Sequence, residues 1–140
     1  MIIRAAKKEE HEALEEIQRR ASLALEDYRT DLEANPDAIA IPEAQIERGD
    51  VIVAELDGRL AGFAALDGSE LDGLFVNPEH WRRGIGAALV DAAIHEARRR
   101  GLSLVTVVAN PTARSFYEKC GFRMEGQAQT RFGPAIKMSR

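Results

Sequence analysis

Residues 71–109 contain an apolar strand, a long helix and a second apolar run, and this succession constrains the fold more than any other part of the chain. A helix is predicted from Gly84 to Arg100, because apolar residues recur on one face at helical spacing and Gly101 can end it. The run LSLVTVVA at 102–109 is continuous and rich in β-branched residues, which is typical of a strand covered on both faces. The order fits a right-handed strand–helix–strand unit.

Further elements are predicted on both sides of this unit. They are a strand at 2–6, a helix at 8–25 with an apolar stripe (Ala13, Leu14, Ile17, Ala21, Ala24, Leu25), an irregular segment at 26–50, strands at 51–56, 60–66 and 71–76, a helix at 111–120, and a strand, turn and strand at 122–140. Asp57 and Gly58 suit the two-residue turn of a hairpin between the second and third strands. No linker or repeat interrupts the 140 residues, so one domain over 1–140 is expected.

Charge is divided unevenly along the chain. Residues 1–76 carry 8 Lys and Arg against 18 Asp and Glu, a net charge of −10, and residues 77–140 carry 11 against 5, a net charge of +6. This division suggests that the second half meets an anion and the first half faces a cation, although solvated acidic helices would also explain it. Because the pI is about 5.4, a small phosphorylated ligand is favoured over a nucleic acid.

The sequence predicts neither a membrane protein nor a secreted one. No segment approaches the roughly 20 apolar residues of a membrane span, and the N-terminal residues become charged too early for a secretory signal. Cys120 is the only cysteine, so no internal disulfide can form, and we expect a cytoplasmic location. Cys120 itself is interpreted as a small hydrophobic residue without a catalytic role.

The junction FVNPEHWRRGIGAAL leads from a strand into the long helix through two glycines. A helix start has unpaired N–H groups and the positive end of the helix dipole, so it attracts an anion such as phosphate. Gly84 and Gly86 would let the ligand approach the backbone, although a tight turn alone would also need glycine. The P-loop pattern fails because no Gly-Lys-Ser/Thr follows, and the dinucleotide-binding pattern fails because Leu89 occupies its third small position.

Two separated motifs resemble the GCN5-related N-acetyltransferase (GNAT) family. WRRGIGAAL is similar to the family's Q/R-x-x-G-x-G/A loop, which binds the pyrophosphate of acetyl-CoA, and NPTARSFYEKCGF matches its N-x-x-A-x-x-F-Y-x-x-x-G-F segment. Trp81 stands where the family has Gln or Arg, a departure that concerns the side chain and not the backbone of the loop. The resemblance implies an α/β (α+β) fold of the GNAT type, a single domain with a mixed, mostly antiparallel central sheet flanked by helices.

The resemblance also implies direct transfer of an acetyl group from acetyl-CoA to a primary amine, without a metal or an acyl-enzyme. Residues expected to bind acetyl-CoA are Leu74, Phe75, Val76, Arg83, Gly84, Ile85, Gly86, Ala87, Ala88, Asn110 and Tyr117. By family position Tyr117 is the general acid for the leaving thiolate, although it could also be a core aromatic residue. Asn110 would contact the CoA arm, and it could also cap the following helix.

Glu70 matches the general base of those family members that have one, and the resemblance names it as the candidate here. Asp72 lies on the same strand face by alternation, so the two carboxylates could raise each other's pKa. Asp72, Glu55 and His80 are weaker candidates for the base, and solvated charge at a strand edge would explain Glu70 equally well. The three histidines (His11, His80 and His95) are scattered without ligand spacing, so no zinc site is predicted.

The acceptor amine cannot be identified from the sequence. Candidate specificity residues are Tyr28, Arg29 and Asp31 in the irregular segment and Gln129 and Arg131 in the final turn. The acidic first half favours a cationic acceptor, on a small molecule or on a protein, and homodimers are common in the family. Two alternatives stay open: a non-catalytic acetyl-CoA-binding module of the same fold, acting as a sensor or docking subunit, and a helical interaction protein.

Overall fold

The computed structural model describes residues 1–25, 29, 33–35, 37 and 39–140 of the chain. Its strands are β1 (Ile2–Ala5), β2 (Val51–Leu56), β3 (Arg59–Asp67), β4 (Glu70–Val76), β5 (Thr106–Ala109), β6 (Arg123–Thr130) and β7 (Gly133–Ser139). Its α-helices are α1 (His11–Leu23), α3 (Glu43–Glu47), α4 (Ile85–Arg99) and α5 (Arg114–Lys119), and its 3-10 turns are η1 (Lys8–Glu10), η3 (Pro78–His80) and η4 (Pro111–Ala113). Tyr28 and Asp31, both candidate specificity residues, lie outside the described residues.

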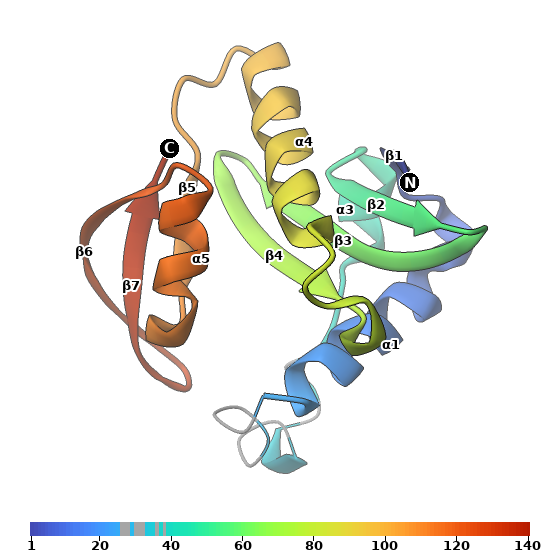
Figure 1. Ribbon diagram of the computed structural model, residues 1–140, viewed down its shortest axis with the longest axis horizontal. Helices are drawn as coiled ribbons and strands as arrows, with labels where there is room; N and C mark the ends of the chain where they lie inside the picture. The colour runs from blue at the N-terminus through green and yellow to red at the C-terminus, as the bar shows by residue number, and fades with distance from the viewer. Residues whose placement is uncertain (26–28, 30–32, 36, 38) are drawn as a thin grey trace.

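Seven strands form one sheet in the order β1-β2-β3-β4-β5-β7-β6 (Figure 1). All neighbouring strands are antiparallel except β4 and β5, which are parallel. This is the mixed, mostly antiparallel sheet that the sequence predicted. The β2–β3 hairpin turns at Asp57 and Gly58, whose φ angles of 52° and 77° match the two-residue turn that suits the twist of a hairpin.

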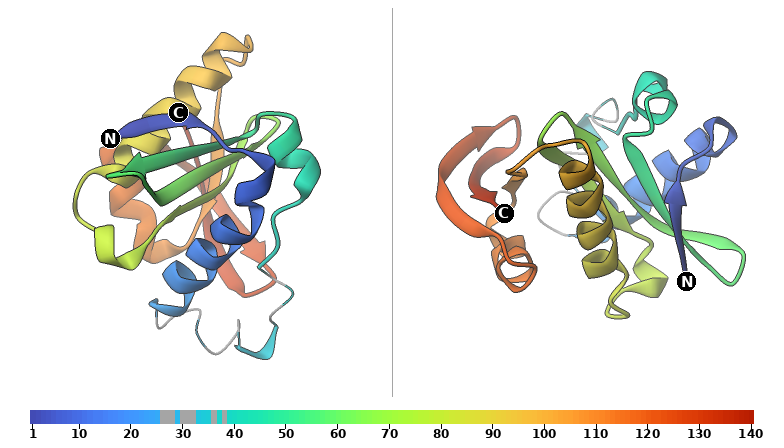
Figure 2. Two further views of the ribbon diagram at one scale, coloured as in Figure 1. Left: turned by 90° about the vertical axis from the view of Figure 1, so that its right-hand side faces the viewer. Right: turned by 90° about the horizontal axis from the view of Figure 1, so that it is seen from above.

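Helices cover both faces of the sheet (Figure 2). On one face α4 buries Leu89 and Val90 against strands β2 to β5 and against α5. On the other face α1 and α3 form a second core, in which Leu14 packs with Phe63 of β3. None of the helices in the described part of the chain is long and apolar enough to cross a membrane.

The segment 102–109 differs from its prediction as a strand buried on both faces. The strand is only Thr106–Ala109, and the side chains of Leu104 and Val108 are 51% and 40% exposed. The core beneath α1 and α3 draws its strand residues from β2, β3 and β4 and does not extend to β5. The second face of β5 therefore meets solvent, because only its α4 face is covered.

The predicted helix at 8–25 is also corrected. Residues 8–10 form the 3-10 turn η1, and α1 runs from His11 to Leu23. Leu14 and Ile17 of the predicted apolar stripe are buried, whereas Ala13 and Leu25 are exposed. Leu25 is exposed because the helix ends before it.

Candidate active site

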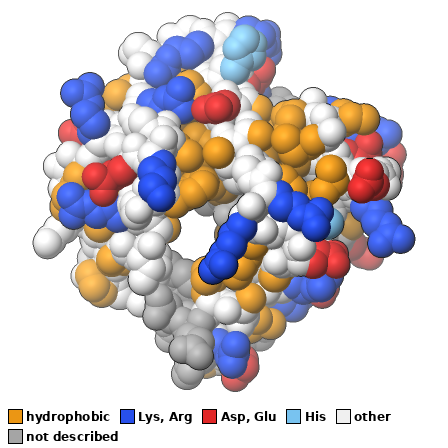
Figure 3. Space-filling view, in the orientation of Figure 1, with side chains coloured by type: hydrophobic (Ala, Val, Ile, Leu, Met, Phe, Trp, Pro, Cys, Tyr) orange, Lys and Arg blue, Asp and Glu red, His pale blue; other side chains and the backbone are white. Residues whose placement is uncertain are grey.

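Strands β4 and β5 enclose a wedge, because they are paired at only one position. Glu70 is opposite Thr106, and the Thr106 amide donates to the Ser69 carbonyl at 2.9 Å. Beyond this point β4 follows β3 to Val76, while β5 follows β7. Figure 3 shows an opening through the molecule in this region, with hydrophobic side chains on its rim. The parallel strands thus diverge at their carboxyl ends and leave room for a ligand between them.

The backbone of β4 presents alternate residues to the wedge. The Asn77 amide donates to the Ala61 carbonyl at 2.8 Å, so by the alternation of an antiparallel ladder Phe75 also turns its main chain toward β3. The N–H and C=O groups of Leu74 and Val76 therefore point toward the wedge. The Phe75 ring lies on the α1 side, with its centroid 5.5 Å from that of Phe63. Of the three predicted strand residues, Leu74 and Val76 are thus the two that face the wedge.

The start of α4 is exposed beside the end of β4. Gly84 is the N-cap residue, with φ of 77° and no side-chain hydrogen bond to the helix, and the first turn holds no acidic residue. The first hydrogen bond of the helix runs from the Ala88 amide to the Gly84 carbonyl. The amides of residues 85–87 therefore have no acceptor within the helix. Ala87 is exposed in this first turn. The helix start therefore has the open N–H groups and the dipole that favour an anion.

The two glycines of the loop are needed for different reasons. Gly84 adopts the left-handed backbone conformation that glycine accepts without strain. A Cβ on Gly86 would lie 3.3 Å from Phe116 Cζ and 3.8 Å from Val76 Cγ2. Gly86 therefore allows α5 and the end of β4 to pack closely against α4. Sequence reasoning had attributed this glycine to the approach of a ligand.

Tyr117 is placed within the core on the α4 side of the sheet. Its side chain is 8% exposed, and its ring makes edge contacts with Phe116 and Phe122, at centroid distances of 5.1 and 5.4 Å. The core interpretation of Tyr117 is therefore correct for the ring. Figure 1 shows that α5 lies beside β5, and the role of Tyr117 as the general acid stays a prediction.

Asn110 follows β5 directly and caps η4. Its Oδ1 accepts hydrogen bonds from the Thr112 amide at 2.8 Å and from the Thr112 hydroxyl at 2.7 Å. The capping interpretation is confirmed by this geometry. A contact from Asn110 to a ligand would therefore use the Nδ2 group.

Glu70 lies where the wedge closes, at the single pair between β4 and β5. Partial burial raises the pKa of the Glu70 carboxyl, the negative charges of Asp72 and Asp67 raise it further, and Lys137 opposes the shift. Strand β4 has a β-bulge at Asp72. Ala65 of β3 pairs with Gly73 and Leu66 pairs with Leu71, so Asp72 has no partner in β3. The simple alternation expected for Glu70 and Asp72 is thus interrupted, yet the charge of Asp72 still acts on Glu70. A raised pKa suits a group that accepts a proton near neutral pH.

Two of the weaker base candidates, Glu55 and His80, lie away from Glu70. Glu55 accepts a hydrogen bond from Arg4 at 2.8 Å between β1 and β2, away from the wedge. His80 lies in η3, and within the described part of the chain its buried Nδ1 has no hydrogen-bond partner. The structure therefore brings neither of them to the point where β4 and β5 meet.

Trp81 makes a contact that the sequence did not reveal. Its indole Nε1 donates to the main-chain carbonyl of Val76 at 2.7 Å, although the side chain is 40% exposed. The acceptor is the last residue of β4, so the side chain joins the loop to the strand end. No local sequence pattern could have indicated this bond, because it depends on the path of the turn.

Arg131 connects two parts of the chain that contain predicted specificity residues. It donates to Asn35 Oδ1 at 3.0 Å and lies 3.2 Å from an Asp37 carboxylate oxygen. Arg29 donates to the Leu23 carbonyl at 3.1 Å, and Gln129 is exposed in β6. The β6–β7 turn is thus held near the segment that follows α1.

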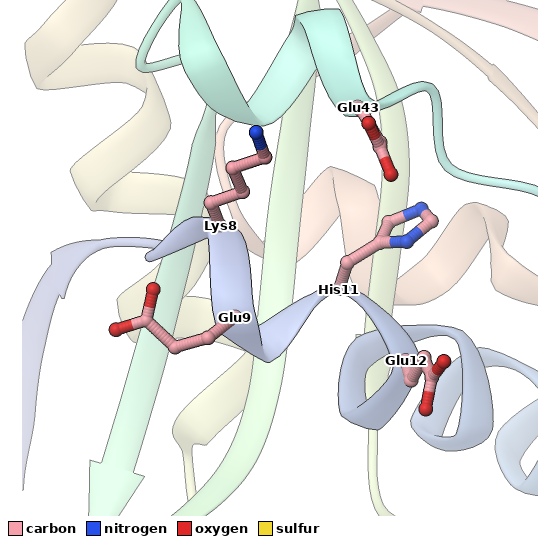
Figure 4. Close-up of a pocket in the computed structure, with 5 residues that line it drawn as sticks. All are labelled: Lys8, Glu9, His11, Glu12 and Glu43. Atoms are coloured by element: carbon pink, nitrogen blue, oxygen red, sulfur yellow. The ribbon is translucent and has the colours of Figure 1, made fainter.

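Two surface hollows lie apart from the predicted site residues. One, of about 420 Å³, is lined by Lys8, Glu9, His11, Glu12 and Glu43 (Figure 4), and the other, of about 510 Å³, lies between β1 and the end of α4. In the first, the His11 ring donates to the Ile41 carbonyl, which ties the start of α1 to the segment before α3. Among the described residues no group of three or more His, Cys, Asp or Glu is placed to hold a metal ion.

The chain is similar in sequence to a known protein family and to a known enzyme. The model of the acetyltransferase (GNAT) family matches residues 11–122. The peptidyl-lysine N-acetyltransferase YjaB of Salmonella typhimurium is 35% identical over 132 residues, which cover 91% of this chain and 86% of that protein.

Two solved structures share the fold. A GCN5-related N-acetyltransferase from Rhodopseudomonas palustris has a TM-score of 0.82 at 24% identity, over 99% of this chain and 94% of that chain. YncA from Salmonella typhimurium, solved with its cofactor acetyl-CoA, has a TM-score of 0.77 at 24% identity, over 100% of this chain and 92% of that chain. The two likenesses show that this chain has the same overall fold as both proteins.

Proposed function

The chain belongs to the acetyltransferase (GNAT) family and is an N-acetyltransferase, and from this premise we propose that it binds acetyl-CoA at the start of α4 and in the wedge. The family resemblance in the sequence is confirmed. We further propose one catalytic domain over residues 1–140, which the single seven-stranded sheet supports. The acetyl group passes directly to a primary amine.

The observation that carries the proposal is the exposed start of α4 beside the wedge. The amides of residues 85–87, which precede the first hydrogen bond of α4, suit a pyrophosphate, because the first turn holds no carboxylate that would compete for them. The main-chain N–H and C=O groups of Leu74 and the N–H group of Val76 suit an arm that contains amides, whereas the Val76 carbonyl already accepts the hydrogen bond of the Trp81 indole. Asn110 and Tyr117 belong to the elements that follow β5 in the chain, Asn110 as the cap of η4 and Tyr117 in α5. These residues fit a ligand with a phosphate end and an amide-containing arm.

Two residues would handle the protons of the reaction. Acetyl-CoA supplies the acetyl thioester that the amine attacks. The Glu70 carboxyl, whose pKa is raised, lies at the closed end of the wedge and would accept the proton that the amine loses. Tyr117 would donate a proton to the departing sulfur from α5.

Catalysis is favoured over the binding-module alternative, because a relative that covers 91% of the chain is named as an enzyme. We propose a cationic amine as the acceptor, on a small molecule or on a protein. The lysine side chain is the first to test, since the named relative is a peptidyl-lysine N-acetyltransferase. The acidic pI argues against a nucleic-acid partner, and the single half-buried Cys120 is consistent with a cytoplasmic setting and with an enzyme that needs no disulfide.

The test of the site uses a charge at the exposed Ala87. Ala87→Glu places a carboxylate in the first turn of α4, where it favours the helix but repels a phosphate. Ala87→Gln has nearly the same shape without the charge and serves as the control. We expect acetyl-CoA affinity, measured by isothermal titration, to fall by about 10-fold or more in the Glu variant only, which is about 1.4 kcal/mol.

Equal affinity in the two variants, with melting temperatures at or above that of the wild type, would contradict the site. Release of free CoA thiol against a panel of lysine peptides, polyamines and amino acids then tests catalysis. A wild-type protein that binds acetyl-CoA but acetylates no amine in the panel would favour the sensor alternative.

A further inference from the structure

Trp81 is the only tryptophan of the chain, and it lies between η3 and Gly84. The Trp81 side chain is 40% exposed, so burial of the rest of the ring favours its place beside the loop but does not by itself fix the direction of the N–H group. The 2.7 Å hydrogen bond from Nε1 to the Val76 carbonyl fixes that direction. The side chain therefore serves to connect the loop with the strand.

The loop that Trp81 connects has a strained backbone. Arg82 has φ of 65°, in the left-handed region that a residue with a Cβ avoids, and Gly84 has φ of 77° two residues later. Such a conformation persists only where neighbouring structure enforces it. Figure 1 shows that this loop leads from the end of β4 to the start of α4.

Besides the Asn77 amide, which donates to the Ala61 carbonyl of β3 at 2.8 Å, few other hydrogen bonds hold the turn in place. The amides of His80 and Trp81 bond to the Asn77 and Pro78 carbonyls, which are contacts within the turn itself. Asn77 Oδ1 and His80 Nδ1 are buried without a hydrogen-bond partner among the residues that the structure describes. Within residues 77–84 as described, the indole provides the one side-chain hydrogen bond to a strand.

We propose that Trp81 is a positioning residue for the donor. By holding the loop against the last carbonyl of β4, it keeps residues 82–84 in the conformation that opens the amides of α4 toward the pyrophosphate. A preformed loop reduces the free energy lost in ordering it when the ligand binds. The inference rests on the proposed acetyl-CoA site and assigns a role to a residue that departs from the family motif.

The single tryptophan allows a test at the level of one atom. Expression with β-(3-benzothienyl)alanine in place of tryptophan changes only residue 81, keeps the bicyclic ring and replaces the N–H group by sulfur. Trp81→Phe serves as a second, encoded variant that also lacks the donor. We expect both proteins to bind acetyl-CoA about 5- to 10-fold more weakly than the wild type, which is about 1–1.4 kcal/mol.

Two further measurements separate positioning from other roles. The KM for acetyl-CoA should rise while kcat stays within about twofold, and the KM for S-acetylpantetheine, which lacks the pyrophosphate, should not change. Hydrogen exchange without ligand should become faster in peptides covering residues 77–88 and stay unchanged in β2 and β3.

Three results would overturn the proposal. They are wild-type acetyl-CoA affinity in both variants, an equal rise of KM for both donors, and unchanged hydrogen exchange in residues 77–88. A wild-type protein that does not bind acetyl-CoA would instead overturn the proposed function. In that case the exchange measurement still decides whether the indole orders the loop.

Discussion

Tyr117 combines packing and chemistry in one residue. Tyr117→Phe removes the hydroxyl but keeps the ring between Phe116 and Phe122, so the fold and the acetyl-CoA affinity should be retained. We expect kcat to fall by about 10-fold or more, or about 1.4 kcal/mol in the barrier, because a positioned acid is lost. The measurement is kcat on the best acceptor from the amine panel. A kcat equal to that of the wild type at every pH would remove Tyr117 from the mechanism.

The ionised carboxylate of Glu70 should lower the stability of the folded protein, although the same group is the proposed general base. Because its folded-state pKa lies above the ordinary value of 4.5, ionisation is disfavoured in the fold, and stability declines as pH rises through the folded pKa. Glu70→Gln should therefore raise the melting temperature at pH 7.5 relative to the wild type, with no difference at pH 4 or below. Its kcat/KM should fall by about 10-fold or more if Glu70 is the base.

Asp72→Asn is the matched variant for Glu70, because it keeps Glu70 and removes a charge that raises its pKa. It should shift the acid limb of the pH–rate profile to lower pH without a large loss of maximal rate. A Glu70→Gln variant that is both fully active and no more stable at pH 7.5 would show that Glu70 is a solvated strand-edge charge.

At the scale of elements, the close contact between β3 and β4 depends on Gly62. A Cβ there would lie 2.7 Å from the Phe75 carbonyl oxygen and 3.1 Å from Val76 Cα, so the backbone of β4 would have to move. Gly62→Ala should lower the free energy of unfolding by roughly 2–3 kcal/mol. Gly126→Ala in β6 is the control, because no atom lies within 4 Å of its added Cβ. Similar unfolding midpoints in urea for the two variants would contradict this account.

The elements with local signals could be predicted from the sequence. The β2–β3 hairpin follows from Asp57-Gly58, and α4 follows from its apolar periodicity and from Gly101. The bulge at Asp72 and the packing role of Gly86 could not be predicted, because they depend on a partner strand and on Phe116. The exposure of Val108 was missed for a similar reason, since burial depends on which helices cover a strand.

At the scale of the whole molecule, strand order is the part that local patterns leave open. The predicted strand–helix–strand unit indicated that β5 lies beside β4, but no local pattern indicated that β7 lies on the other side of β5. Register and neighbour choice arise from contacts between residues far apart in the chain. The candidate site residues could nevertheless be named from the sequence, because the two family motifs are local, and their roles stay predictions. Trp81 was noticed only as a departure from the motif, since its partner Val76 belongs to the preceding strand.

The division into an acidic and a basic half has a partly structural meaning. Arg100, at the end of α4, donates to the buried carboxylate of Asp50 at 2.6 Å and to the Gly49 carbonyl at 3.1 Å. Arg131, in the β6–β7 turn, lies 3.2 Å from an Asp37 carboxylate oxygen. Some of the charge that suggested ligands of opposite sign therefore serves to join the two halves of the fold. The remaining contrast still favours an anion at the start of α4.

The single pair between β4 and β5 has a consequence for how long the protein survives in a cell. If acetyl-CoA fills the wedge as proposed, it contacts both halves of the sheet, and its binding energy becomes folding energy. A ligand at 100 times its Kd adds about 2.7 kcal/mol, a large part of the roughly 5–15 kcal/mol that stabilises a domain. Starved cells would then degrade this enzyme faster than well-fed cells, because its empty form unfolds more often. The abundance of the enzyme would follow the supply of its own substrate, without any change in its gene's expression.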